Sequence, residues 1–215
     1  MVLKNYDYLA KIIVVGNPNV GKSSVSSVLS DQGFDYEYNM TIGVDFFAVR
    51  RNVNNIRWKM HLWDTAGQES FKSITRSYYR EAAITLLVFD LSRRDTFLRL
   101  DKWKEDVERE NTDTLFVLVG NKKDLQRKIE YSEANDWAKT NNMMYIETSA
   151  KNNQFGDDGT DMFSLILNKF NKEKDKNNHN GVTNNNNKLD KRICSLENCL
   201  LEDRYNRNKY CCIIS

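Results

Sequence analysis

Apolar residues follow two patterns along this chain. Short β-branched runs, which predict buried strands, cover residues 9–15, 44–52, 56–64, 85–91, 115–121 and 144–148. Stretches with apolar residues three to four positions apart, which predict amphipathic helices, cover residues 21–30, 96–110, 131–140 and 161–174. Because the two kinds alternate up to about residue 176, we expect an α/β fold with a mainly parallel sheet covered on both faces.

One pair of strands departs from this alternation. Only Val53-Asn54-Asn55 separates residues 44–52 from residues 56–64, which predicts an antiparallel hairpin. In the stretch 96–110, Phe97 and Trp103 belong to a helical stripe, and we interpret both as core side chains.

Composition limits the function classes. The chain has 215 residues, 40% of them hydrophobic and 29% charged, which is typical of one soluble globular domain with an appendage. A net charge of +2 gives no support for a nucleic-acid partner. The longest apolar stretch, residues 84–89, is far shorter than a membrane span, and residues 1–7 lack the apolar core of a signal peptide.

The last part of the chain differs in composition. Residues 171–187 are rich in Asn and Lys and cannot bury enough apolar surface to offset the entropy of ordering. We therefore expect a domain over residues 5–176 and a disordered tail over residues 177–215. All four cysteines lie in this tail, and a domain without cysteine fits a reducing compartment.

The most informative motif follows the first predicted strand. Gly16-Asn-Pro-Asn-Val-Gly-Lys22-Ser23 fits the phosphate-binding P-loop pattern G-x-x-x-x-G-K-[ST]. A Gly-rich turn at a helix N-terminus makes a cradle of backbone N–H groups for an anion. Lys22 would reach the outer phosphates, and the Ser23 hydroxyl would ligate Mg²⁺. The residues expected to line the cradle are Asn19, Val20, Gly21, Lys22, Ser23 and Ser24.

A second motif, Asp64-Thr-Ala-Gly67-Gln68, follows the strand 56–64. An acidic residue at this strand end can hold Mg²⁺ through water. Gly67 would let the backbone approach a γ-phosphate, and Gln68 would orient an attacking water. Together with Lys22, this predicts hydrolysis of a nucleoside triphosphate.

Two further loops predict the base. Asn121-Lys122-Lys-Asp124 follows the strand 115–121, and Ser149-Ala150-Lys151 follows the strand 144–148. The Asp124 carboxylate can accept two N–H bonds from guanine, which adenine cannot donate in that geometry, so the wrong base would leave it unpaired. The Ala150 N–H would meet guanine O6.

In this order, the four motifs resemble the small GTPases of the Ras superfamily over about residues 5–176. Within it the chain is similar to the Rab branch, in residues 41–46, 62–69, 73–80 and 87–97; the last two stretches look most like the Rabs of the secretory and early endosomal pathways. The resemblance implies a three-layer G domain: a six-stranded, mostly parallel sheet with one antiparallel strand, and about five helices.

The resemblance also implies roles by position. Thr41 would ligate Mg²⁺ and sense the γ-phosphate, within a switch I over residues 38–46. Phe34 would stack edge-on to guanine and Tyr38 would lie over the phosphates; the alternative for both is a local packing anchor. Residues 66–80 would form switch II, and loss of the γ-phosphate would release both switches. Since the loop motifs contain no obvious arginine finger, we expect slow intrinsic hydrolysis that a GTPase-activating protein accelerates.

Three positions depart from the family pattern. Pro18 replaces a small residue in the P-loop, where it lacks an N–H and fixes φ. Nucleotide binding should survive this change, and the property that it bears on is the rate of hydrolysis. Glu81 stands where similar Rabs have Gly, so either the backbone there is strained or the preceding helix continues through it. Residues 152–159 make a longer connection, in which Asp157 and Asp158 are read as a solvated turn and not as a metal site.

The chain ends in Cys211-Cys212-Ile-Ile-Ser. Cys212 begins a C-a-a-X box of the farnesyl type, but the paired cysteines resemble Rab tails, which carry two geranylgeranyl groups; two lipids anchor stably where one does not.

We therefore predict a Rab-like GTPase that binds GTP or GDP with Mg²⁺ and acts in vesicle-mediated protein transport. Its partners would be a GTPase-activating protein, an exchange factor, a GDP dissociation inhibitor, an escort protein and effectors. It would cycle between cytosol and the cytoplasmic face of endomembranes (Golgi, ER or early endosome). The alternatives are a GTP-binding scaffold that scarcely hydrolyses, and a Ras- or Rho-type signalling GTPase with a farnesylated C-a-a-X box.

Overall fold

The computed structural model describes residues 5–37, 40–68, 72–155, 161–169 and 194–195. Six strands form the body of one sheet: β1 (Tyr8–Gly16), β2 (Val44–Val53), β3 (Ile56–Thr65), β4 (Ile84–Asp90), β5 (Leu115–Asn121) and β6 (Met144–Ser149). The labelled helices are α1 (Lys22–Leu29), α2 (Lys72–Tyr79), α3 (Arg94–Phe97), α4 (Leu100–Glu108) and α5 (Tyr131–Thr140). A further helix covers residues 162–169, and two-residue strands β7 (Gln154–Phe155) and β8 (Cys194–Ser195) complete the described elements.

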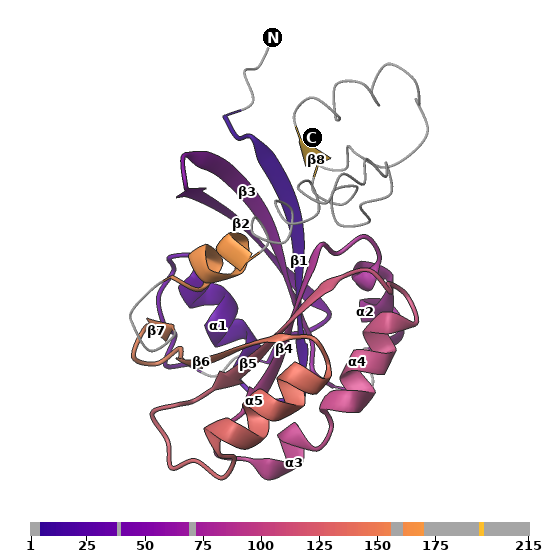
Figure 1. Cartoon of the computed structure of the whole chain (residues 1–215), viewed down its shortest axis with the longest axis vertical. Coiled ribbons are helices and arrows are strands. Elements are labelled where there is room, and N and C mark those ends of the chain that lie inside the picture. The colour runs from indigo at the N-terminus through magenta and orange to yellow at the C-terminus, as the bar shows by residue number, and fades with distance from the viewer. Residues whose placement is uncertain (1–4, 38–39, 69–71, 156–160, 170–193, 196–215) are drawn as a thin grey trace.

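The sheet has the order β2-β3-β1-β4-β5-β6-β7 (Figure 1). The pairs β1–β3, β1–β4, β4–β5 and β5–β6 are parallel, whereas β2 and β3 form an antiparallel hairpin. At its tip Asn54 and Asn55 have φ values of 53° and 63°. Positive φ at both central residues is what a two-residue type I′ turn requires. The predicted mostly parallel sheet and its one antiparallel hairpin are both confirmed.

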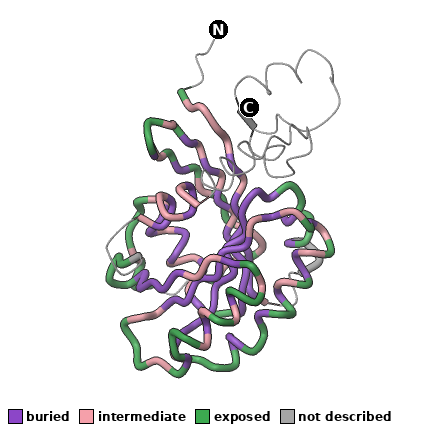
Figure 2. The backbone as a smooth tube through the Cα atoms, in the orientation of Figure 1, coloured by how far each residue is buried: buried purple, intermediate pink, exposed green. Residues whose placement is uncertain are grey.

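Each face of the sheet packs against its own group of helices. Along β1, Ile12 and Val14 belong to the core that contains Val25 of α1 and Phe163 of the helix 162–169. The alternate residue Ile13 belongs to the core of the other face. That second core is built from α3, α4 and α5, with Phe97, Trp103 and Ala134 among its buried side chains. The buried residues accordingly run through the centre of the molecule (Figure 2). The three-layer arrangement expected from the alternating pattern is confirmed.

Two helical expectations need correction. The single helix predicted over residues 96–110 is two helices, α3 and α4, because the chain turns at Leu98 and Arg99. The structure also contains α2, which the apolar pattern did not predict. The helix predicted over residues 161–174 is present over residues 162–169, and its remainder lies outside the described residues. None of the helices in the described ranges is long and apolar enough to cross a membrane.

Glu81 shows how the chain leaves α2. The helix ends at Tyr79, so it does not continue through Glu81, which has a φ of 59°. A side chain in this left-handed region is strained by roughly 1–2 kcal/mol. The strained backbone is therefore the correct one of the two expected alternatives.

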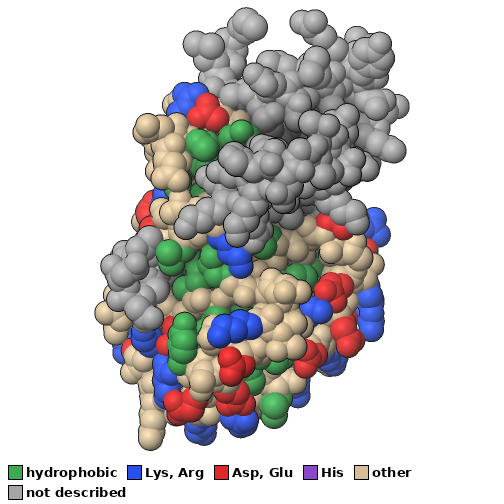
Figure 3. All heavy atoms as spheres, viewed as in Figure 1, with side chains coloured by type: hydrophobic (Ala, Val, Ile, Leu, Met, Phe, Trp, Pro, Cys, Tyr) green, Lys and Arg blue, Asp and Glu red, His purple; other side chains and the backbone are tan. Residues whose placement is uncertain are grey.

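Little of the predicted tail is described. Its two described residues form β8, which pairs antiparallel with Tyr8 and Leu9 of β1. The predicted lipidation sites Cys211 and Cys212, and the acidic pair Asp157 and Asp158, lie outside the described residues. On the face shown in Figure 3, acidic and basic side chains of the domain are interspersed, as the small net charge leads one to expect.

Candidate functional site

The loops that follow β1, β3, β5 and β6 meet at the carboxyl ends of these parallel strands, the usual position of a ligand in an open α/β sheet. Together with the chain around Phe34, Tyr36 and Thr41, they line a cleft of about 670 Å³. Most of the residues predicted to bind nucleotide line it: Asn19, Gly21, Lys22, Ser23, Ser24, Phe34, Thr41, Gly67, Gln68, Asn121, Lys122, Asp124, Ala150 and Lys151. Val20 and Ser149 instead contact residues of the cleft wall, and Tyr38 lies outside the described residues.

The P-loop needs its glycines for steric reasons. Gly16 has a φ of 147°, and a Cβ there would lie 2.1 Å from the Val88 carbonyl oxygen. Gly21 has a φ of 88°, and its Cβ would lie 2.3 Å from the Asn121 side-chain nitrogen. Gly21 is also the N-cap of α1 and has no side chain to cap the first turn. The first N–H groups of α1 therefore suit an anionic ligand.

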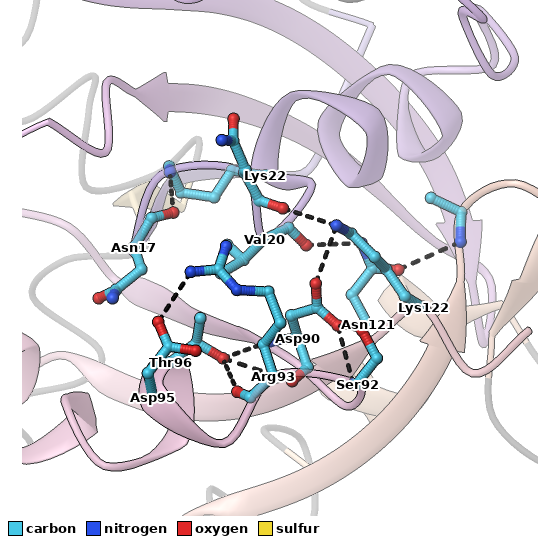
Figure 4. Close-up of polar contacts among 12 residues, drawn as sticks. Asn17, Val20, Lys22, Asp90, Ser92, Arg93, Asp95, Thr96, Asn121 and Lys122 are labelled. Carbon is cyan, nitrogen blue, oxygen red and sulfur yellow. Dashed lines mark hydrogen bonds and ion pairs between the residues drawn. The ribbon is translucent and has the colours of Figure 1, made fainter. Parts of the chain in front are cut away.

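Lys22 is held at the bottom of this loop. Its Nζ donates to the carbonyl oxygens of Gly16 and Asn17, at 3.0 and 2.9 Å, and the residue is 6% exposed. Figure 4 shows the bond to Asn17. Burial lowers the pKa of Lys22 to about 8, although the nearby Asp64 charge works in the opposite direction. A phosphate group beside Nζ would favour the charged form again.

The three predicted Mg²⁺ ligands converge. The Ser23 hydroxyl donates to Asp64 Oδ2 at 2.5 Å and lies 2.7 Å from the Thr41 hydroxyl, which is 3.4 Å from the same carboxylate oxygen. Asp64 is fully buried, and its Oδ1 has no hydrogen-bond partner among the described residues. Burial raises the pKa of Asp64 to about 6.

This donor set fits Mg²⁺. Two hydroxyls and one carboxylate are all-oxygen ligands, and Mg²⁺ is usually held by one or two carboxylates together with waters and phosphate oxygens. A cation would also compensate the buried carboxylate. Ser23, Thr41 and Asp64 would hold it, directly or through water.

Gly67 approaches the P-loop very closely. A Cβ on Gly67 would lie 2.4 Å from Lys22 Nζ and 2.7 Å from the Pro18 nitrogen, so only glycine fits. The neighbouring Gln68 lines the cleft, and its Nε2 lies 2.8 Å from Met40 Sδ. Gln68 thus lies at the end of the cleft that Lys22, Ser23 and Gly67 form, which we call the phosphate end, and its role in orienting water stays a prediction.

The other end of the cleft, which we call the base end, is formed by Asn121, Asp124 and Ala150. Its polar groups bond to one another. Asn121 Nδ2 donates to the Val20 carbonyl at 2.9 Å, and the Ala150 N–H donates to Asn121 Oδ1 at 3.3 Å. The Lys122 ammonium bonds to the Asn19 carbonyl at 2.7 Å and pairs with Asp90 at 2.8 Å (Figure 4). These contacts join the P-loop, the N-K-x-D loop and the S-A-K loop.

Asp124, the predicted guanine acceptor, is exposed in the cleft. Its Oδ1 accepts a 2.5 Å hydrogen bond from the Ser149 hydroxyl. The Lys123 N–H donates to the Thr148 carbonyl at 3.1 Å, which ties the same two loops together. The carboxylate is therefore oriented by the protein before any base is present.

The structure also shows supporting residues that the motifs did not indicate. Glu147 is buried and accepts hydrogen bonds from Arg127 at 2.7 Å and from the Tyr145 hydroxyl at 2.8 Å. It therefore connects the end of β6 to the chain that follows the N-K-x-D loop. The hydrogen bond to Glu147 raises the pKa of Arg127, and burial together with the same carboxylate raises the pKa of Tyr145. Asp90, the last residue of β4, pairs with Lys122, and its position as an acid at a strand end of this sheet edge is the signal in the sequence that could have indicated it.

Phe34 has contacts of a packing anchor, and its stacking on guanine stays a prediction. Its ring packs against the core and makes an edge contact with Tyr36 at 5.1 Å between centroids, and it also lines the cleft. Tyr36, which is 81% exposed, and Met40 line the cleft as well and were not predicted.

A comparison with family models matches residues 11–191 to the Ras family. The match begins within β1, covers all four motifs and extends past residue 176, where we expected the domain to end.

Proposed function

The chain belongs to the Ras family of small GTPases, and we propose that it is a Rab-like GTPase that recruits effectors to a membrane in its GTP state. One observation carries the nucleotide part of this proposal. A single cleft joins Ser23 and Thr41, whose hydroxyls contact the buried Asp64 carboxylate, at one end to Asp124 and Ala150 at the other. The first group suits a magnesium-bound polyphosphate, and the second suits guanine.

The residues of the phosphate end would divide the chemistry among them. Mg²⁺, when bound, would neutralise charge on the β- and γ-phosphates. Lys22 and the N–H groups at the start of α1 would stabilise the charge that develops in the transition state. Gln68 would orient the attacking water, and Gly67 leaves room for the γ-phosphate.

The contacts of Thr41 suggest how the switch would work. Thr41 belongs to the predicted switch I, yet its hydroxyl bonds to Ser23 at the start of α1. Gly67, near the start of the predicted switch II, packs against the P-loop. A γ-phosphate and Mg²⁺ would hold both segments at these contacts, and hydrolysis would release them.

Effectors would bind at the aromatic surface between the two switches. The Phe46 and Trp63 rings lie 4.8 Å apart, and Trp63 lies 5.1 Å from Tyr78 of α2. Ile42 is 74% exposed and Phe46 is 39% exposed. Apolar side chains exposed next to a nucleotide-dependent segment suit a partner that reads the nucleotide state.

We further propose that Cys211 and Cys212 carry geranylgeranyl groups added with an escort protein. A GDP dissociation inhibitor would extract the lipidated GDP form into the cytosol, and the GTP form would stay on the cytoplasmic face of an endomembrane. Mass analysis of the expressed C-terminus tests this. Lipid on both cysteines with Ser215 retained is expected, whereas one farnesyl group with Ser215 removed would favour the Ras- or Rho-type alternative.

Single-turnover GTP hydrolysis tests the enzymatic part. The purified chain loaded with GTP should release phosphate slowly, and the catalytic domain of a Rab GTPase-activating protein should accelerate release. Gln68→Leu, which keeps the binding contacts, is the matched control and should remain slow in both conditions. Tight GTP binding without phosphate release under either condition would favour the scaffold alternative that Pro18 motivates.

A further inference from the structure

Asn17 occupies a position of the P-loop that the motif leaves open, yet its side chain is buried, with the residue 5% exposed. Its Oδ1 accepts a 2.6 Å hydrogen bond from Nε1 of Trp103 in α4, which is 4% exposed. A buried amide oxygen that loses its donor bears a desolvation cost. This bond therefore fixes one corner of the P-loop to a helix far away in the sequence.

The backbone of the same corner supports the reactive end of the cleft. The Asn17 carbonyl accepts from Lys22 Nζ at 2.9 Å. A Cβ on Gly67 would lie 2.8 Å from the Asn17 carbonyl carbon and 2.7 Å from the Pro18 nitrogen. The corner Asn17–Pro18 is thus the surface against which the residue before Gln68 packs.

The helix α4 also contacts switch II. Asp106, whose side chain is 6% exposed, lies 3.5 Å from an Arg76 nitrogen of α2. Helix α4 consequently contacts both the P-loop, through Trp103, and α2, through Asp106. None of the contacts described above for Asn121, Asp124 or Ala150 involves this helix.

We propose that Trp103, through its hydrogen bond to Asn17, is a positioning residue for hydrolysis and switching. It holds the Asn17–Pro18 corner where Gly67 must close and where Gln68 must face the γ-phosphate. The inference rests on the proposed GTPase function. It predicts that breaking the bond slows hydrolysis far more than it weakens retention of GDP, which depends also on the base end.

Three variants separate the bond from mere packing. Trp103→Phe removes the donor and keeps an aromatic ring, Asn17→Leu removes the acceptor at similar volume, and Asn17→Asp keeps an acceptor oxygen. Trp137→Phe in α5, a half-buried tryptophan packed near Phe97, is the matched control.

The first measurement compares single-turnover GTP hydrolysis with the dissociation rate of fluorescent GDP. Trp103→Phe and Asn17→Leu should each slow hydrolysis about tenfold, the size expected for one buried hydrogen bond expressed in the transition state. GDP dissociation should change by less than about threefold, and Asn17→Asp and Trp137→Phe should stay close to the parent. Equal effects on both rates, or Asn17→Asp as slow as Asn17→Leu, would overturn the proposal.

The second measurement does not depend on hydrolysis. The indole N–H resonance lost in Trp103→Phe identifies Trp103 in the NMR spectrum. It should shift when GDP is replaced by a non-hydrolysable GTP analogue, and it should move in Asn17→Leu even without nucleotide. A resonance unchanged in both comparisons would overturn the positioning role. Absence of hydrolysis with these shifts intact would instead overturn only the enzymatic part of the proposed function.

Discussion

The two ends of the cleft are built on opposite principles. At the phosphate end, charged groups are buried with incomplete compensation: burial lowers the pKa of Lys22 and raises that of Asp64. At the base end, the polar groups satisfy one another, as Asn121 does with Val20 and Ala150. The phosphate end is therefore completed by its ligand, whereas the base end is already organised for it.

This difference assigns separate tasks to the two ends. A preorganised carboxylate loses little entropy on binding and discriminates sharply against a base that leaves it unpaired. Buried charges that the protein itself does not neutralise make the affinity for nucleotide depend on metal and on pH. Selectivity should then be a property of the base end, and sensitivity to Mg²⁺ and protons a property of the phosphate end.

The largest expected effect is on base selectivity. Asp124→Asn should lower GDP affinity by a factor on the order of 10³ and favour xanthine nucleotides, because the amide presents a donor where guanine also donates. Competition between GDP and xanthosine diphosphate for the stripped protein measures this. Ser149→Ala, which removes only the hydrogen bond to Asp124, should lower GDP affinity by about fivefold without changing the preferred base. Retained guanine selectivity in Asp124→Asn would contradict its role.

The second effect lies at the phosphate end. Ser23→Asn should weaken Mg²⁺ binding and lower GTP affinity more than GDP affinity, by about tenfold or more, because an amide replaces a ligating hydroxyl. Titration of both nucleotides at fixed Mg²⁺ measures the ratio. A GTP affinity equal to that of the parent would show that Ser23 is not a metal ligand.

Proton competition gives a third, pH-dependent effect. Because burial raises the pKa of Asp64 from 3.8 to about 6, the folded protein retains a proton there that the unfolded chain has released. Without metal, the stability contributed by this group is present below pH 4 and lost as pH rises through about 6. Mg²⁺ affinity should conversely fall by up to about tenfold per pH unit below that pKa.

Calorimetric titration of the nucleotide-loaded protein with Mg²⁺ at several pH values checks this slope. Asp64→Asn should remove the slope together with most of the affinity. The factor by which Asp124→Asn lowers GDP affinity reports on the base end, and this factor should show no matching pH dependence in the same range. A pH-independent Mg²⁺ affinity would mean that the buried carboxylate does not face the metal.

The smallest expected effect is on stability, at Glu81, which lies outside both ends of the cleft. Glu81→Gly should stabilise the protein by about 0.5–1 kcal/mol, since glycine adopts the positive φ without strain but loses more entropy on folding. Thermal unfolding measures the gain, and Glu81→Ala, which keeps the strain, should give none. Nucleotide affinity should be unchanged in both variants. A gain of the same size in Glu81→Ala would place the effect in the side chain and not in the backbone.

The sequence predicted those parts of the site that are contiguous in the chain. The P-loop and the loops around Gly67, Asp124 and Ala150 each follow a strand, and a parallel sheet brings such strand ends to one edge. The hairpin tip was predictable for a similar reason, because Asn54 and Asn55 tolerate the positive φ of a tight turn.

The remainder depends on tertiary contacts that no local pattern records. The hydrogen bond between Asn17 and Trp103 joins residues 86 positions apart, and Trp103 is equally well explained as a core residue. The break between α3 and α4 falls inside a continuous apolar stripe. It could not be predicted, because neither Leu98 nor Arg99 has a helix-breaking side chain. Helix α2 has too few apolar positions for its pattern to predict a helix.

Equilibrium binding of the nucleotide-stripped protein tests the division of the cleft most directly. GDP should bind tightly with Mg²⁺ and at least about a hundredfold more weakly with a chelator, whereas ADP should bind weakly in both conditions. Equal affinities for GDP and ADP, or GDP binding that ignores Mg²⁺, would contradict the account.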